Sequence, residues 1–284
     1  GSTSALNFNG GAAKFSVSAS VPSVPIVLNS EGGGVEIDSG LNVNLSNTIS
    51  GSGAFTKTGD GTLTLSGANT YSGPTRIDGG TLSVSGSLSD STAVNVGASG
   101  TYALSADDTV GSIEGSGAIN LGSSELTSGG LNTNTTYSGV KSGTGGTRKL
   151  GSGTLTLSGA NTYSGPTRID GGTLSVSGSL SDSTAVNVGA SGTYALSADD
   201  TVGSIEGSGA INLGSSELTS GGLNTNTTYS GVKSGTGGMR KIGTGQLTLS
   251  GANTYTGSTF VDSGTLLNQG SLSHLTPLVI SELG

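Results

Sequence analysis

The single histidine of the 284-residue chain, His274, is the one side chain that could act as the base of a Ser–His–Asp triad. It lies beyond the last sequence repeat, and no G-x-S-x-G nucleophile motif occurs anywhere in the chain. Gly143–Gly146 is not followed by G-K-[ST], so it does not indicate a phosphate-binding loop. The absence of cysteine excludes thiol catalysis and cysteine-bound zinc. We therefore expect no catalytic residue, no cofactor and no enzyme activity.

Paired carboxylates occur at Asp107–Asp108 and again at Asp199–Asp200. Adjacent residues of a strand point to opposite faces, so neither pair can flank one glycosidic bond. We expect solvated turn residues at these positions, with weak calcium coordination as the alternative. Neither an EF-hand loop nor a G-G-x-G-x-D pattern is present, and we predict no metal site.

Tyrosines recur at a fixed spacing and are the candidate binding residues. Tyr71, Tyr163 and Tyr255 stand in N-T-Y-[ST]-G, and Tyr137 and Tyr229 stand in a related T-T-Y-S-G. If they were exposed along one side, they would form a row able to bind a glycan or a protein partner multivalently. The alternative is that they cap the core at a corner of the fold, with the hydroxyl in water.

Composition and charge narrow the classes of protein. Glycine contributes 54 of the 284 residues, and charged residues make up only 10%. The net charge of −8 argues against a nucleic-acid partner, because phosphates require a basic face. No apolar run approaches 18 residues. The composition therefore favours either disorder or a regular fibrous fold over a compact α/β enzyme.

An internal duplication organises the chain. Residues 61–146 recur without a change as residues 153–238, an offset of 92, and a varied third copy begins at Gly245. The predicted parts are a lead-in over 1–60, one repeat unit over 61–152, a second over 153–244, and a partial third over 245–284. Tandem blocks of this kind indicate a solenoid, in which each turn needs only to match its neighbours.

Alternation with a period of two indicates the elements. Leu63 and Leu65 flank Thr64, and Leu82 and Val84 flank Ser83, as in strands with one buried face. Clusters of Gly, Ser, Asn and Asp separate these runs as turns, and no helical stripe is present. We predict an all-β, right-handed parallel β-helix of roughly 12 rungs, with roughly four rungs of ~23 residues in each repeat.

The segment GTLTLSGANTYSGPTRIDGGTLSV, at 61–84 and 153–176, resembles the passenger-associated transport repeat of type V autotransporters. SGSGAFTKTGD at 50–60 precedes its first copy. The resemblance implies a right-handed parallel β-helix secreted through a C-terminal outer-membrane barrel of the same polypeptide and anchored on a Gram-negative surface. It also implies that the repeats support folding during secretion. With no leader or barrel in the sequence, we expect a passenger fragment.

The function that we expect is a non-catalytic, rigid stalk or adhesin serving adhesion, autoaggregation or biofilm formation, in a virulence setting. Its expected partners are a protein or glycan of a host or neighbouring cell, or further copies of itself. The alternative is the β-helical stalk of a protease or esterase passenger whose catalytic domain lies outside this sequence.

Overall fold

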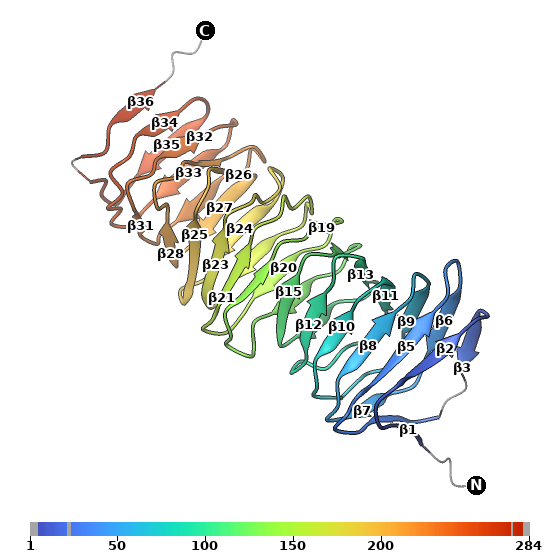
Figure 1. Cartoon of the computed structure of the whole chain (residues 1–284). Coiled ribbons are helices and arrows are strands. Elements are labelled where there is room, and N and C mark those ends of the chain that lie inside the picture. The colour runs from blue at the N-terminus through green and yellow to red at the C-terminus, as the bar shows by residue number, and fades with distance from the viewer. Residues whose placement is uncertain (1–4, 22–23, 274, 281–284) are drawn as a thin grey trace. The chain divides into compact units, whose positions relative to one another are not determined.

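The computed structural model describes residues 5–21, 24–273 and 275–280, and every regular element in these ranges is a β-strand. The chain divides into two compact units, residues 1–145 and 146–284, which are treated separately below. Figure 1 shows the strands of each unit lying side by side as successive layers of a coil.

Unit 1 contains nineteen strands in the described residues. They are β1 (Leu6–Phe8), β2 (Ala12–Phe15), β3 (Ala19–Val21), β4 (Ile26–Leu28), β5 (Gly33–Ile37), β6 (Asn42–Leu45), β7 (Ile49–Gly51), β8 (Phe55–Thr58), β9 (Thr62–Leu65), β10 (Thr75–Ile77), β11 (Gly80–Val84), β12 (Ala93–Val96), β13 (Gly100–Leu104), β14 (Asp108–Val110), β15 (Ser112–Gly115), β16 (Ala118–Asn120), β17 (Leu126–Ser128), β18 (Thr135–Tyr137) and β19 (Lys141–Ser142). They form three sides of a coil. One side is β2-β5-β8-β10-β12-β15-β18 and the next is β3-β6-β9-β11-β13-β16-β19, while β1-β4-β7 and β14-β17 lie on the third.

Unit 2 repeats this plan with seventeen strands. They are β20 (Thr147–Lys149), β21 (Thr154–Leu157), β22 (Thr167–Ile169), β23 (Gly172–Val176), β24 (Ala185–Val188), β25 (Gly192–Leu196), β26 (Asp200–Val202), β27 (Ser204–Gly207), β28 (Ala210–Asn212), β29 (Leu218–Ser220), β30 (Thr227–Tyr229), β31 (Lys233–Ser234), β32 (Met239–Lys241), β33 (Gln246–Leu249), β34 (Thr259–Val261), β35 (Thr265–Asn268) and β36 (Leu278–Ile280). Its sides are β20-β22-β24-β27-β30-β33-β35, β21-β23-β25-β28-β31 and β26-β29-β32-β34-β36.

Strands on each side pair in parallel with those of the preceding and following turns, as β11 does with both β9 and β13. Because consecutive turns stack directly, the alternation of the sequence becomes a layered interior: Leu63, Leu65, Leu82 and Val84 are fully buried. The fold class predicted from the sequence is confirmed: the chain is all-β, with parallel strands stacked as a solenoid of about 14 turns, against the roughly 12 predicted.

The turns are shorter than predicted, and a repeat does not hold a whole number of them. In unit 2 the register advances by 17 residues from Thr193 to Ala210 and by 22 from Ile211 to Lys233, not by ~23 throughout. β21 and β33 are the same segment in successive copies, yet they lie on different sides. From β21 the chain makes four complete turns and returns to the same side at β31. It then passes along the other two sides, through β32 and β33, which is a further two thirds of a turn. The 92 residues of a repeat therefore make about 4⅔ turns. Strands of different sequence stack because any strand with apolar residues inward and small polar residues outward fits its neighbour.

We predict that equivalent positions of successive repeats face different sides. A nitroxide pair at Arg168 on β22 and Phe260 on β34 joins equivalent positions in different sheets. Its separation should exceed the ~22 Å expected for 4⅔ turns along the axis alone, because the width of the coil is added. A pair at Arg168 and Thr228, three strand steps apart in one sheet, serves as the ruler and should lie ~14 Å apart. Pulsed electron resonance finding the Arg168–Phe260 pair at ~19 Å, the value for four whole turns, would contradict the assignment.

Candidate functional site

The tyrosines proposed as a binding row are buried. Tyr71, Tyr137, Tyr163, Tyr229 and Tyr255 expose none of their surface, and neither do Tyr102 and Tyr194. In addition, the strands that precede Tyr163 and Tyr255, β21 and β33, lie on different sides of unit 2. The five residues therefore do not form an exposed face for a glycan or protein partner. Alternation with inward-facing neighbours was the signal in the sequence that could have shown this.

Each of these tyrosine hydroxyls finds a partner inside the protein. The Tyr71 hydroxyl lies 2.6 Å from the Thr75 hydroxyl, which is 3.1 Å from that of Thr92. The Tyr137 hydroxyl donates to the Gly117 carbonyl at 2.6 Å. The copies repeat these bonds: Tyr163 with Thr167, Tyr255 with Thr259 and Tyr229 with Gly209. The tyrosines are thus core residues, and their hydroxyls are bonded to protein groups and do not face water.

The adjacent carboxylates separate as alternation requires, but only one of each pair is solvated. Asp107 is exposed and accepts a hydrogen bond from the Glu125 amide at 2.8 Å. Asp108 is buried, accepts from the Tyr102 hydroxyl, and accepts from the Leu88 amide at 3.0 Å. Asp200 repeats this arrangement with Tyr194 and Leu180. The expectation of two solvated turn residues was therefore wrong for Asp108 and Asp200, which are structural core residues.

Burial raises the pKa of the Asp108 and Asp200 carboxyls to about 6. Because the folded pKa lies above the ordinary aspartate value of 3.8, the protonated acid favours folding, and this contribution is lost as pH rises from about 4 to about 6. A shift of this size corresponds to about 3 kcal/mol for each carboxyl. We expect Asp108→Asn with Asp200→Asn to flatten that decline, since asparagine keeps the acceptor for Leu88 and does not titrate. Urea unfolding at pH 4 and pH 6.5 measures the difference; an unchanged decline in the variant would contradict it.

Five lysines that the sequence analysis did not single out are buried. Three of them, Lys57, Lys149 and Lys241, occupy the same place in successive repeats. Each ammonium donates to two carbonyls just beyond it and to one in the next turn; the acceptors are Thr58, Gly59 and Gly79, then Leu150, Gly151 and Gly171, then Ile242, Gly243 and Ser263. Gly59, Gly151 and Gly243, which follow these lysines by two residues, have φ of 71°, 70° and 70°. This left-handed conformation favours glycine at the third position of K-x-G. Burial lowers the pKa of Lys57 to about 8.

The other two lysines, Lys141 and Lys233, are fully buried, each near a tyrosine ring. The Lys233 ammonium lies 3.9 Å from the centroid of the Tyr229 ring, and that of Lys141 lies 5.8 Å from the Tyr137 ring. Burial lowers the pKa of both amines to about 7. Such groups are often functional when they line a cleft. Here they face the interior and no surface.

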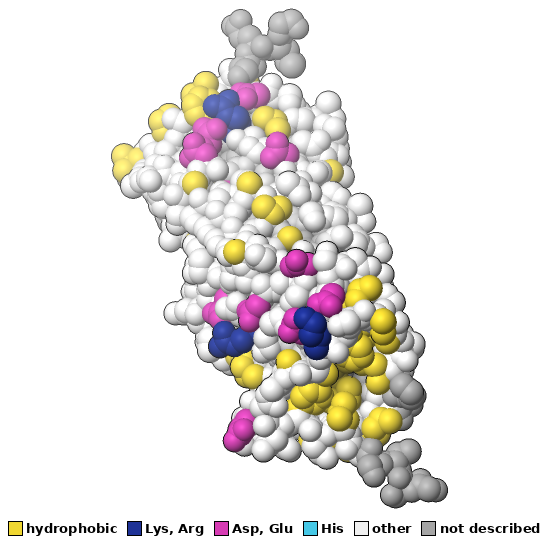
Figure 2. All heavy atoms as spheres, turned by 45° about the vertical axis from the view of Figure 1, so that its right-hand side comes forward, with side chains coloured by type: hydrophobic (Ala, Val, Ile, Leu, Met, Phe, Trp, Pro, Cys, Tyr) yellow, Lys and Arg dark blue, Asp and Glu magenta, His cyan; other side chains and the backbone are white. Residues whose placement is uncertain are grey.

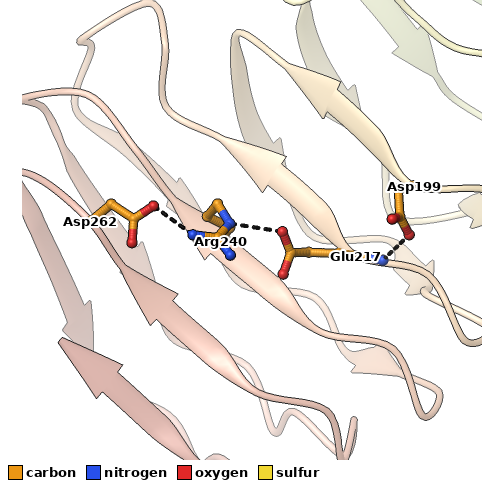
Figure 3. A network of polar contacts seen from close by, with 4 residues as sticks. All are labelled: Asp199, Glu217, Arg240 and Asp262. Carbon is orange, nitrogen blue, oxygen red and sulfur yellow. Dashed lines mark hydrogen bonds and ion pairs between the residues drawn. The ribbon is translucent and has the colours of Figure 1, made fainter. Parts of the chain in front are cut away.

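Charged groups on one side of unit 2 join neighbouring turns. Arg240 bonds Glu217 at 2.8 Å and Asp262 at 2.7 Å, and the Glu217 amide donates to Asp199 (Figure 3). Arg240 lies on β32, and the three carboxylates lie next to the ends of β26, β29 and β34. These four strands are neighbours in one sheet, so the network runs from turn to turn along the solenoid. Exposed pairs of this kind add about 1 kcal/mol or less each. The network links neighbouring turns at the surface, and its carboxylates are bonded to Arg240 or to a backbone amide.

No cluster of metal-binding side chains is assembled in the described part of the chain. Among residues 5–21, 24–273 and 275–280, no three His, Cys, Asp or Glu side chains lie close enough to hold a metal ion. His274 lies outside these ranges. The same residues include no helix of the length and apolarity needed to cross a membrane.

Comparison with known proteins identifies the repeated segments. A family model described as the passenger-associated-transport-repeat matches residues 55–84, 148–176 and 239–267. These ranges hold equivalent strands: β8 to β11, β20 to β23 and β32 to β35. Each match also contains one of the carbonyl-bound lysines.

One curated relative is named as an autotransporter. The chain is 38% identical over 104 residues to a protein named Adhesin BmaC autotransporter, from Brucella suis biovar 1 (strain 1330). The alignment covers 34% of this chain and 3% of that protein, so the chain spans a small part of its relative's length. No solved structure matches. The chain is therefore an autotransporter passenger β-solenoid that carries three passenger-associated transport repeats.

Proposed function

We propose that this chain is a non-catalytic stretch of a surface adhesin, displayed at the outer membrane of a Gram-negative bacterium. The main supporting observation is that the three family matches cover equivalent sets of four strands, so the repeated sequence encodes turns of the solenoid. The groups that chemistry would use support this role: Asp108, Asp200, Lys141 and Lys233 are buried. The relative's name, an adhesin, points the same way.

A folding role for the repeats has a structural basis in one asparagine. The Asn69 side chain accepts from the Ile49 amide at 3.0 Å and donates to the Gly67 and Ser87 carbonyls at 3.1 and 2.8 Å. It thereby joins three successive turns at a corner where no regular strand pairs. Asn161 and Asn253 occupy the same position in the later repeats. We propose that these corners let a newly secreted turn dock on the preceding one.

Surface display tests the adhesin function. The chain would be fused to the translocating part of an unrelated autotransporter and expressed in a non-adherent strain, with that part alone as the control. We expect more cells bound to epithelial monolayers or to each other than in the control. Equal binding in both strains would overturn the adhesin role. Proteolytic or esterase activity of the purified chain would contradict the non-catalytic role.

A further inference from the structure

The outer surface of unit 1 has a hollow of about 200 Å³ where β2, β5 and β8 lie side by side. It lies outside the core, because the strand residues at its centre alternate with buried neighbours such as Val35 and Phe55. Its lining combines small residues with two threonines and one glutamate: Gly11, Ala12, Glu31, Gly33, Gly34, Ala54, Thr56 and Thr58. The chain therefore offers a concave, partly polar surface here, supported by three paired strands.

The hollow exists because one outward column of residues begins with small side chains. Strand pairing aligns Ala12, Gly34 and Thr56 in this column. The column then continues with longer side chains, at Arg76, Asn95 and Glu114. A Cβ atom added to Gly34 would lie 2.9 Å from the Thr56 carbonyl oxygen, so the floor has no room for a side chain there. Glycine at this position thus keeps the hollow open.

The polar side chains around the hollow are available to a ligand. Glu31 is exposed at the corner that leads into β5, and its carboxylate has no hydrogen-bond or ion-pair partner among the described residues. The hydroxyls of Thr56 and Thr58 likewise bond no other residue in that part of the chain. Arg76 follows Thr56 in the column, and its exposed guanidinium has no carboxylate partner in the described ranges.

Two charges of opposite sign border the hollow without pairing with each other. β8 separates β5, which follows Glu31, from β10, which carries Arg76. A cation would be attracted by Glu31 and repelled by Arg76, and an anion the reverse. A neutral ligand rich in hydroxyl groups can bond both, because a carboxylate accepts and a guanidinium donates. Charged side chains are few and scattered on the face of the molecule shown in Figure 2, so a neutral polar ligand also suits the wider surface.

We propose that this hollow binds one neutral hexose unit of a cell-surface glycan; the proposal rests on the adhesin function and names the chemistry of one partner. The Glu31 carboxylate accepts hydrogen bonds from sugar hydroxyls, and the Thr56 and Thr58 hydroxyls both donate and accept them. The C–H groups of the sugar ring lie on the floor made by Ala12 and Gly34. The volume is below the ~300–1,000 Å³ of sites for drug-sized ligands, which fits a single sugar unit better than a chain of them.

Titration of the full chain with the methyl glycosides of glucose, galactose and mannose tests the proposal. A hexose has about 12 non-hydrogen atoms, so we expect at least one of the three to bind with a Kd in the millimolar range. Saturation-transfer NMR detects such binding, and calorimetry measures it. Weak binding of one unit gains strength when several chains on a cell engage several glycans together.

Two substitutions at the hollow should weaken this binding. Ala12→Leu fills the hollow from an exposed strand position, and we expect a loss of at least tenfold. Glu31→Gln keeps the size of the side chain and removes the charged acceptor, and we expect a loss of at least threefold. The matched controls, Ala118→Leu and Glu114→Gln, change exposed strand positions of unit 1 outside the hollow and should bind as the wild type does.

Hydrogen exchange in β5 and β8 shows whether each variant keeps the wild-type fold. Wild type that binds none of the three glycosides, or folded Ala12→Leu and Glu31→Gln chains that bind as tightly as wild type, would overturn the proposal. Tighter binding of glucosamine or glucuronic acid than of the neutral sugars would also overturn it, since the site would then select a charge. Adhesion of displayed wild type to host cells would leave the adhesin function standing in those cases, so the two failures are distinguishable.

Discussion

Leu65→Asp is expected to unfold the turns around β9 while unit 2 remains folded. Leu65 is fully buried, and β9 pairs with β6 and β11. Removing a buried leucine costs about 2–5 kcal/mol, and an unpaired buried carboxylate adds to this cost. Because each turn contacts only its neighbours, the damage should be local. Hydrogen exchange should lose protection in β6, β9 and β11 and retain it in β21, β23 and β25.

Thr64→Asp is the matched control for this change. Thr64 lies on the same strand, and its side chain points outward. The substitution adds the same charge without entering the core, so we expect a loss within about 0.5 kcal/mol and normal exchange protection. Protection lost equally across both units in Leu65→Asp would contradict local stacking and indicate a single cooperative core.

Lys233→Met is expected to stabilise the protein at pH 7 by several kcal/mol. The Lys233 ammonium lies over the Tyr229 ring, makes no hydrogen bond within the described residues, and has a pKa lowered to about 7. Because the folded pKa lies below the ordinary lysine value of 10.5, the stability of the protein is full above pH 10.5 and falls as pH drops towards 7. Methionine fills a similar volume and carries no charge. The gain should therefore be large at pH 7 and small near pH 10.5, as measured by urea unfolding.

Lys241→Met should have the opposite effect. The Lys241 ammonium is bonded to the carbonyls of Ile242, Gly243 and Ser263. Its removal leaves buried carbonyls without partners, which costs about 1–3 kcal/mol for each one that water cannot reach. If both substitutions destabilised the protein equally at both pH values, the distinction between an unbonded and a carbonyl-bound lysine would be refuted.

Short-range patterns predicted most of the architecture. Alternation in Leu63-Thr64-Leu65 correctly indicated which side chains enter the core, and the exact duplication correctly indicated a solenoid. Alternation outweighs residue type at Lys57, which the sequence analysis did not single out. Lys57 follows Phe55 by two residues and points inward with it, although lysine is a residue type usually found at the surface. Of the two interpretations left open for Tyr71, the structure supports burial in the core, as alternation with its buried neighbours indicates.

The sequence by itself determined the strand content and the inward and outward faces, because these depend on neighbours two or three residues apart. It also determined the repeat family, because the repeated segments can be aligned without a structure. Only the tertiary structure decided how many turns each repeat makes. The corner segments have different lengths, so 92 residues close 4⅔ turns and bring β33 to a different side from β21. Tertiary packing also decided the hydrogen-bond partners of the buried polar groups. It brings the Asp108 carboxylate to the Tyr102 hydroxyl, and the Lys241 ammonium to carbonyls of two turns. Those pairings join residues up to 22 positions apart, and their register follows from the summed loop lengths, which no local pattern encodes.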